Sequence, residues 1–270
     1  MNVLPMERQV QIITALVEGN SVRATARMVG VEHKTVLRVL LRVGDRCGEI
    51  LNERMRRLPC RIVQMDEIWT FVAKKEKQVT ADDDPTQVGD QYVFVAMDSE
   101  SKLIPSFWVG KRNAATAWYF VQDLKQRLAS RVQLTTDGFR PYLPAVEDAF
   151  GADVDYAMLI KTYEEGAESE KRYSPGQIVN ALPIPVSGNP KPHLISTSHV
   201  ERQNLTIRMQ LRRFTRLTNA FSKKLENLKA ALALHFCWYN FCRVHTSLRV
   251  TPAMQAGIAD HVWGIKGLVA

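Results

Sequence analysis

Cysteine is scarce in this chain of 270 residues, and its four cysteines form no recognisable ligand pattern. Cys47, Cys60, Cys237 and Cys242 include no CxxC pair and no zinc-finger spacing with histidine. A disulfide framework and a structural zinc site are therefore not expected. The four residues are instead predicted to be buried thiols of a protein that works in a reducing cytosol.

Long hydrophobic runs are also absent. No stretch of 18 apolar residues occurs, so no membrane-spanning helix is expected. The first residues, Met1 to Pro5, lack the charged-then-apolar order of a secretion signal, and no internal repeat is visible. Hydrophobic residues make up 46% of the chain, which is enough for a sizeable core. These features predict a cytoplasmic globular protein.

Negative charge is in the minority, because 36 Lys and Arg face 28 Asp and Glu for a net charge of +8. The excess is concentrated between residues 200 and 250, where ten Lys and Arg accompany only two Asp and Glu. One interpretation of such a segment is a solvated basic surface. The other is a surface for an anionic partner, and double-stranded DNA is the partner predicted here.

Residues 1–57 are predicted to be helical and to bind DNA. Gly19-Asn20 ends a first helix, Ser21 caps a second over 22–29, and Gly30 makes the turn into a third over 32–43. This order is typical of a helix-turn-helix, although an ordinary three-helix bundle is the alternative. The start of the third helix would offer four side chains to the major groove: His33, Lys34, Thr35 and Arg38.

After residue 57 the periodicity changes from helical to strand-like. Strands are expected over 61–72, 91–97, 103–109, 132–136 and 155–161, and helices over 113–128, 141–150, 199–214 and 222–242. This is a ribonuclease-H-like order, in which the first and fourth strands lie side by side at the centre of a mixed sheet with flanking helices. We therefore predict a catalytic domain over 58–255 and a tail over 256–270. The proline-rich segment 163–192 reads as an insertion with little regular structure.

Three carboxylates stand out in this arrangement. Asp66 lies inside the apolar run 62–69, Asp137 ends the run 132–138, and Glu201 opens the basic helix that begins at residue 199. A carboxylate within a buried strand is costly unless it is paired or binds a cation. Two facing strand acids and one helix acid would suit two Mg²⁺ or Mn²⁺ ions acting on a phosphodiester.

Each of these acids has another interpretation. Asp66 could simply pair with an arginine, and alternation along the strand sends its neighbour Glu67 to the other face without deciding which of the two is the ligand. Asp137 could belong to a plain turn with Gly138. Glu201 could complete a capping box with Ser198. The helix face that Glu201 shares with Asn204 and Arg208 favours metal and phosphate binding over a cap alone.

Taken together, the motifs resemble the bacterial insertion-sequence-one family of transposases, in the DDE class. The resemblance rests on the segments 65–69 (MDEIW), 135–138 (TTDG), 198–208 (SHVERQNLTIR), 212–224 and 238–248. It implies that Asp66, Asp137 and Glu201 are the DDE triad of a Mg²⁺-dependent enzyme of the bacterial nucleoid, which cuts and joins the terminal inverted repeats of its own element. Founding members carry a zinc-finger-like segment before the helix-turn-helix, whereas no Cys/His cluster precedes Ser21 here.

This interpretation makes further predictions about partners. The basic residues after Glu201 would hold DNA phosphates beside the catalytic acids: Arg208, Arg212, Arg213 and Arg216. A transposase must hold two ends together, so at least a homodimer on DNA is expected. The alternatives are a metal-dependent nuclease or integrase that does not mobilise its own element, and a DNA-binding regulator without catalytic activity.

Overall fold

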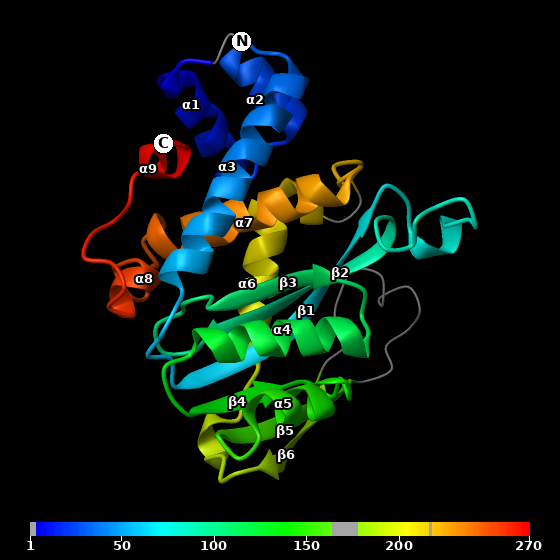
Figure 1. The fold of residues 1–270 in the computed structure, drawn as a ribbon, viewed down its shortest axis with the longest axis vertical. Coiled ribbons are helices and arrows are strands. Elements are labelled where there is room, and N and C mark those ends of the chain that lie inside the picture. The colour runs from blue at the N-terminus through cyan, green and yellow to red at the C-terminus, as the bar shows by residue number, and fades with distance from the viewer. Residues whose placement is uncertain (1–3, 164–177, 216–217) are drawn as a thin grey trace.

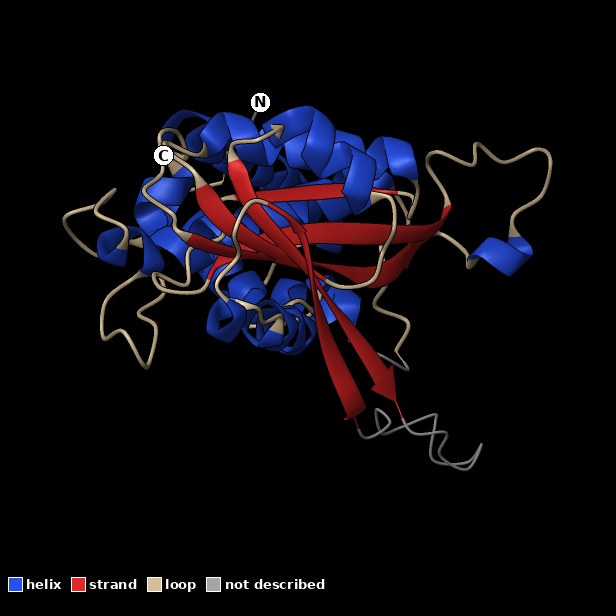
Figure 2. Ribbon diagram, turned by 90° about the horizontal axis from the view of Figure 1, so that it is seen from below, coloured by secondary structure: helices blue, strands red, loops and turns tan. Residues whose placement is uncertain are grey.

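The computed structural model describes residues 4–163, 178–215 and 218–270. Three N-terminal helices stand at one end of the molecule, and a mixed sheet with helices on both faces occupies the rest (Figures 1 and 2). No helix in these ranges is long and apolar enough to cross a membrane.

The N-terminal helices are α1 (Met6–Val17), α2 (Val22–Val29) and α3 (His33–Arg54). Ser21 caps α2 by accepting a 3.1 Å hydrogen bond from the backbone N–H of Ala24, as predicted. Gly30 then takes the left-handed conformation, with φ of 69°, that the turn into α3 requires. The prediction that the third helix ends at residue 43 is wrong. Its buried stripe continues through Cys47 to Leu51, and this half of α3 packs against α7 (Leu225–Phe241), so tertiary contacts carry the helix past Gly44.

The sheet has six strands among the described residues, in the spatial order β3-β2-β1-β4-β5-β6. They are β1 (Ile62–Val72), β2 (Gly89–Asp98), β3 (Ser106–Gly110), β4 (Val132–Thr136), β5 (Val154–Tyr163) and β6 (Ile178–Ser187). β2 runs antiparallel to β1, whereas β4 runs parallel to both β1 and β5. The ribonuclease-H-like order and the central β1–β4 pair are therefore confirmed.

Helices cover both faces of this sheet (Figure 2). On one side, α4 (Ala114–Arg127) and α5 (Tyr142–Phe150) pack their aromatic rings on Phe94 of β2. Asn113 caps α4 as predicted, by accepting a 2.9 Å hydrogen bond from the N–H of Thr116. On the other side lies α6 (Ser198–Gln210), followed by α7. The short helices α8 (Pro252–Gln255) and α9 (Ile265–Val269) complete the chain, and α9 packs on α1.

The segment 163–192 is more regular than predicted. Its part from Ile178 to Ser187 forms β6, which pairs antiparallel with β5. Pro183 and Pro185 looked like breakers, but β6 is an edge strand with a single neighbour, where a missing N–H is tolerated. Residues 164–177 lie outside the described part of the chain.

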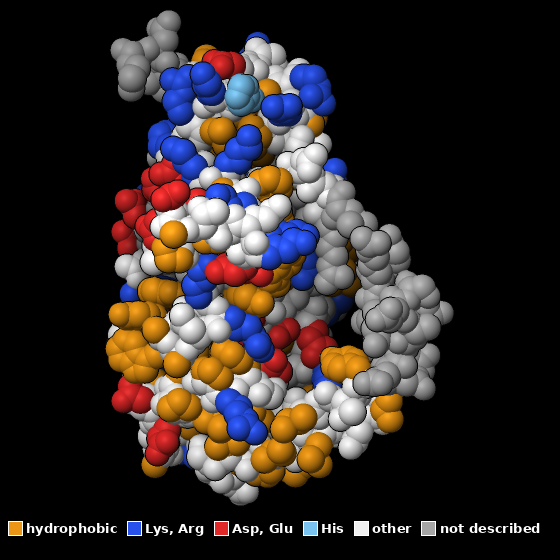
Figure 3. Space-filling view, turned by 90° about the vertical axis from the view of Figure 1, so that its right-hand side faces the viewer, with side chains coloured by type: hydrophobic (Ala, Val, Ile, Leu, Met, Phe, Trp, Pro, Cys, Tyr) orange, Lys and Arg blue, Asp and Glu red, His pale blue; other side chains and the backbone are white. Residues whose placement is uncertain are grey.

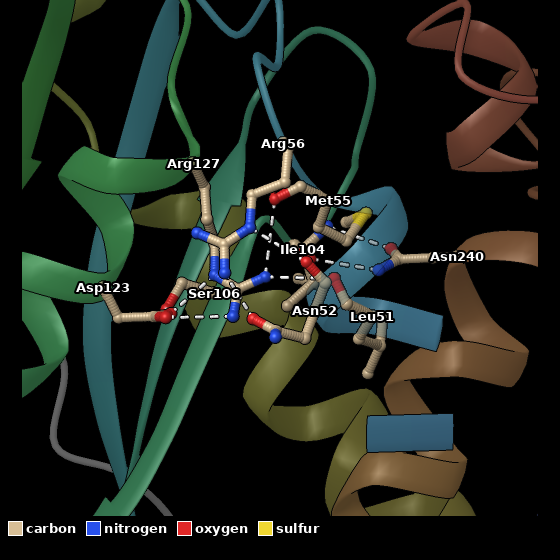
Figure 4. A network of polar contacts seen from close by, with 9 residues as sticks. All are labelled: Leu51, Asn52, Met55, Arg56, Ile104, Ser106, Asp123, Arg127 and Asn240. Atoms are coloured by element: carbon tan, nitrogen blue, oxygen red, sulfur yellow. Dashed lines mark hydrogen bonds and ion pairs between the residues drawn. The ribbon is translucent and has the colours of Figure 1, made fainter. Parts of the chain in front are cut away.

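The far end of α3 is joined to the end of α4, one of the helices that cover the sheet, by a polar network around Arg127 (Figure 4). The Arg127 guanidinium pairs with Asp123 at 2.6 Å and donates to the carbonyl oxygens of Leu51, at 3.1 Å, and Met55. Nearby, the side chain of Asn240 on α7 exchanges two 3.0 Å hydrogen bonds with the backbone of Ile104. The helical region and the sheet are thus fastened together, and the predicted domain boundary at residue 57 stays a prediction.

Candidate active site

The register of the two central strands places Asp66 beside Asp137. Paired residues of β1 and β4 run from Ile62 with Gln133 to Met65 with Thr136. The next residue along each strand is an aspartate, and β4 ends at that point. The parallel pairing therefore delivers both carboxylates to one place, as the sequence predicts.

A third carboxylate joins them, and it is not the one predicted. Single oxygens of Asp66, Glu67 and Asp137 all lie within 4.8 Å of one another. Each residue as a whole is half-buried, although the side chain of Glu67 is only 2% exposed. Strand alternation predicts that Asp66 and Glu67 lie on opposite faces of β1, so that only one of them was expected at the site. Because β4 stops at Thr136, Asp137 lies beyond the paired part of the strand, where carboxylates from both faces of β1 can approach it.

On the other face, α6 packs its first turns against β1. The Oε1 atom of Gln64 accepts hydrogen bonds from the backbone N–H groups of His199, at 2.9 Å, and Val200, at 3.2 Å. Asn204 donates from Nδ2 to Oδ2 of Asp66 at 2.8 Å. The start of α6 is thus capped by a side chain of β1, and no side-chain cap comes from its own N-cap residue, Thr197. The capping-box interpretation of Glu201 is therefore wrong.

Glu201 makes contacts of its own one turn before Asn204. Its Oε1 accepts a 2.7 Å hydrogen bond from the Thr197 hydroxyl and forms an ion pair with Lys161 of β5. Glu201 is near enough to contribute to the raised pKa of Asp66. It is not, however, among the three residues whose oxygens approach one another within 4.8 Å. The structure therefore brings together two of the three predicted acids and holds the third close by on a lysine.

Two cationic side chains at the site went unnoticed in the sequence. Arg112 contacts Glu67 Oε2 from Nε at 3.2 Å and Asp137 Oδ2 from Nη2 at 3.9 Å. Its guanidinium also lies over the ring of Phe139, 4.0 Å from the ring centroid. Arg112 stands just before the N-cap of α4, and Lys161 stands near the end of β5. Only the folded topology brings either of them to the carboxylates, so no local pattern could have identified them.

The carboxylates of the cluster are crowded, and Arg112 offsets their mutual repulsion only in part. Burial, followed by the neighbouring charges of Glu67 and Asp137, raises the pKa of Asp66 to about 7. Burial and the charge of Asp137 likewise raise the pKa of Glu67 to about 7, against the opposing effects of Tyr142 and Arg112. A bound divalent cation would remove this penalty by favouring the ionised carboxylates.

The donor atoms fit such a cation. They are all carboxylate oxygens, the ligands that Mg²⁺ and Mn²⁺ prefer. Two buried oxygens of these residues make no hydrogen bond of good geometry among the described residues: Glu67 Oε1, on a member of the cluster, and Asn204 Oδ1, on the amide that donates to Asp66. Buried oxygens of this kind are normally satisfied by protein, water or an ion.

The residues predicted to read DNA lie at the start of α3. His33, Lys34 and Arg38 are exposed, and Thr35 is half-buried and accepts a 3.2 Å hydrogen bond from Arg38. Their exposure suits contact with a groove. Their role in base recognition stays a prediction.

The arginines predicted to bind phosphates differ from one another in burial and in the element that carries them. The expected helix over 199–214 ends at Gln210, and Arg212 is exposed in a short 3₁₀ turn, Arg212–Phe214. Arg208 is half-buried on α6, whereas the guanidinium of Arg213 is largely buried and donates to Ser222 at 2.8 Å. Arg213 is thus placed as a structural contact in this arrangement, and Arg216 lies outside the described residues.

Charged side chains of both signs lie on one face of the molecule. Figure 3 shows acidic side chains beside a hollow, with lysine and arginine side chains spread over the same face as far as the N-terminal helices. A negatively charged centre within a positive surround suits a polyanion that approaches a metal site.

The chain is similar to known proteins only at the level of solved structures. No family model matches the chain, and no curated protein matches it. Among solved structures, a piggyBac transposase synaptic complex with hairpin DNA aligns over 98% of this chain and 68% of its own, at 12% identity and a TM-score of 0.42. A Mos1 transposase paired-end complex with the left transposon end aligns over 58% of this chain at 16% identity and a TM-score of 0.24, and the match spans only 60% of that Mos1 chain. A Mos1 mariner paired-end complex with Mn aligns over 88% of this chain and 76% of its own, at 13% identity and a TM-score of 0.32. At these identities the likeness concerns the fold alone.

Proposed function

We propose that this chain is a DNA transposase of the DDE class, related to the bacterial insertion-sequence-one family. In this proposal it binds the terminal inverted repeats of its own element and carries out metal-dependent strand cleavage and strand transfer. The observation that carries the proposal is the placement of Asp66 and Asp137 on neighbouring parallel strands, with Asn204 and Glu201 packed over them from a basic helix.

The residues have distinct tasks in this proposal. Asp66, Asp137 and Glu201 would hold two Mg²⁺ or Mn²⁺ ions, whose chemistry is to activate the attacking water or 3′-hydroxyl and to stabilise the leaving oxygen. Asn204 fixes the orientation of the Asp66 carboxylate through its 2.8 Å hydrogen bond. Lys161 neutralises Glu201 and holds it near the end of β5. In-line phosphoryl transfer depends mainly on such positioning of charge.

DNA binding would be divided between two surfaces. The exposed side chains at the start of α3 would read bases at the element's ends: His33, Lys34, Thr35 and Arg38. Arg208 and Arg212 lie after Glu201 in the chain, where they would position the backbone of the strand to be cut. Base contacts specify a sequence, whereas phosphate contacts position the duplex.

The test is a cleavage and joining assay with duplexes taken from the DNA that flanks the gene. We expect Mg²⁺-dependent nicking and joining by the unchanged protein. Asp66→Asn, Asp137→Asn and Glu201→Gln should abolish both while end binding remains. The control is Glu76→Gln, which removes an acid that pairs with Lys111 outside the site, and it should keep full activity.

The outcomes separate the rival functions. Nicking without joining would identify a metal-dependent nuclease. Sequence-specific binding without any cleavage would identify a regulator. Activity that survives in Glu201→Gln would remove Glu201 from the proposed triad.

Paired-end joining also requires assembly, so we propose at least a dimer on DNA. Light scattering of the protein with an end duplex should give a mass of two chains or more. A complex of one chain with one duplex that still completes paired-end joining would refute this.

A further inference from the structure

Glu67 is an unusual acid because it is buried and only half satisfied. Its side chain is 2% exposed, and Oε2 contacts Arg112 at 3.2 Å. Oε1 makes no hydrogen bond of good geometry among the described residues, although the buried hydroxyl of Tyr142, which also has no other partner, lies close enough to lower the pKa of Glu67. A buried carboxylate oxygen that the protein satisfies so weakly can also accept a cation.

The geometry around Glu67 shows where such a group would lie. Its carboxylate comes within 4.8 Å of oxygens from both Asp66 and Asp137. The amide that donates to Asp66 also carries an unpartnered buried oxygen, Asn204 Oδ1. Glu201, by contrast, is already engaged by Thr197 and Lys161. The carboxylates that approach one another are therefore those of Asp66, Asp137 and Glu67, whereas Glu201 is held by partners of its own.

We propose that Glu67 is a direct ligand, with Asp66 and Asp137, of a divalent cation of the Mg²⁺ and Mn²⁺ class, and that this site forms before DNA binds. The inference refines the metal site of the proposed function and rests on that function for the class of cation. Glu201 completes a second position only after it leaves Lys161. This differs from the triad implied by the family resemblance, in which Asp66 was chosen where the residues alone left Asp66 and Glu67 as alternatives.

Arg112 has a defined part in this proposal. Its guanidinium reaches two of the three ligands, Glu67 and Asp137, and is 39% exposed, so it can move away without unpacking the core. Arg112 therefore competes with the cation for the same carboxylates. Once displaced, it remains near the cluster on the aromatic ring of Phe139, where a DNA phosphate is a suitable new partner.

The competing interpretation is that Glu67 is only a structural partner of Arg112. The two interpretations differ in what they predict for Glu67→Gln. If Glu67 is a ligand, this change weakens metal binding. If Glu67 is structural, it leaves metal affinity unchanged, whereas Arg112→Gln tightens binding in either case because Arg112 also contacts Asp137.

The experiment measures Mn²⁺ binding to the full chain without DNA, by calorimetry and by the electron paramagnetic resonance signal of free Mn²⁺. Glu67→Gln should weaken binding by roughly 10–100-fold, as loss of a ligand or of its close support does elsewhere. Arg112→Gln should tighten it by about tenfold, because a nearby positive charge has been removed. The surface control Glu76→Gln should bind Mn²⁺ as the unchanged protein does, and Glu201→Gln should lose less affinity than Glu67→Gln because Glu201 is engaged by Lys161.

The results can overturn the proposal in two ways. Unchanged Mn²⁺ affinity in Glu67→Gln together with a loss in Glu201→Gln would restore the ligand set predicted from the sequence. Unchanged or weaker Mn²⁺ affinity in Arg112→Gln would show that Arg112 does not compete with the metal ion for the carboxylates. This affinity can still be measured if Glu67→Gln fails to fold. A protein that binds Mn²⁺ through Glu67 but neither cuts nor joins DNA would keep this inference and reject the proposed function.

Discussion

The side-chain amide of Asn204 donates a 2.8 Å hydrogen bond to Oδ2 of Asp66, which ties the basic helix α6 to the central strand β1. The other oxygen of that carboxylate accepts from the N–H of Glu67 at 2.9 Å. Both oxygens of the Asp66 carboxylate thus accept a hydrogen bond, and one of the two donors, Asn204, is 138 residues away in the sequence. Such support fixes the direction in which a ligand oxygen points.

Loss of this amide should impair catalysis more than DNA binding. Asn204→Ala leaves Oδ2 of Asp66 without a donor, and we expect strand cleavage to slow by roughly 10–100-fold. Binding to an end duplex should hardly change. Leu205→Ala, on an exposed position of the same helix, is the control and should be near normal in both assays. Equal losses of cleavage and binding in Asn204→Ala would point to a distorted helix.

The crowded carboxylates should make stability depend on pH in the absence of metal. The pKa values of Asp66 and Glu67 are about 7 in the folded protein, above their ordinary values of 3.8 and 4.5. A raised carboxyl pKa means that the folded state holds its proton more tightly, so this stability is present at about pH 4 and is lost as pH rises to about 7.

Asp66→Asn removes part of this dependence. In EDTA at pH 8 the variant should be more stable than the unchanged protein by roughly 1–3 kcal/mol, and at pH 4 the two should be equal. Urea unfolding at several pH values measures the difference. Added Mn²⁺ should stabilise the unchanged protein at pH 8 and have little effect on the variant. A variant that is less stable at every pH would contradict the predicted repulsion.

The two proposed DNA surfaces should respond differently to loss of charge. Arg38→Ala, at the exposed start of α3, should weaken binding to the correct end by about 1–3 kcal/mol and binding to random DNA much less. Arg212→Ala should weaken both to a similar extent and lower the salt slope by roughly one unit. Competition binding with end and scrambled duplexes at several salt concentrations measures both effects. If only Arg212→Ala altered sequence preference, the two surfaces would be reversed.

The contact between α3 and α7 should be intolerant of even one added methyl group. A Cβ atom built on Gly44 would lie 2.6 Å from the backbone and side chain of Ala230, whereas one built on Gly48 would meet nothing within 4 Å. Gly44→Ala should therefore destabilise the protein by about 1–3 kcal/mol. Gly48→Ala in the same helix should stabilise it by about 0.5–1 kcal/mol through helix propensity. Thermal or chemical unfolding of the pair gives a direct comparison, and equal effects would mean that the helices can move apart.

The sequence predicts the sheet order and the meeting of Asp66 with Asp137 because both depend on strong local patterns. Apolar runs define β1 and β4, and a ribonuclease-H-like order makes them neighbours. The length of α3 and the presence of β6 were missed for a shared reason. Glycines and prolines indicate breaks in an isolated segment, but packing on α7 and an edge position in the sheet accommodate them here.

The residues that surround the carboxylates could not be predicted from local sequence patterns. Arg112, Lys161 and Gln64 reach the site from three different strands or loops, and none is marked by its neighbours in sequence. Alternation places Asp66 and Glu67 on opposite faces of β1, which led us to expect only one of the two at the site without deciding which. That rule describes a strand inside a sheet, and it loses force where the partner strand ends.

The unbroken course of α3 has a geometric consequence for the DNA. At 22 residues the helix is about 33 Å long, which corresponds to roughly ten base-pair steps of a duplex. One end carries the exposed side chains proposed to read bases, and the other is locked to α4 and α7 through Arg127 and the close approach at Gly44. A continuous helix of this kind connects the proposed base-reading end to the catalytic region and also fixes the distance between them. The ends of the element would then tolerate changes of base between the recognised sequence and the cleaved bond, but not the insertion of half a helical turn.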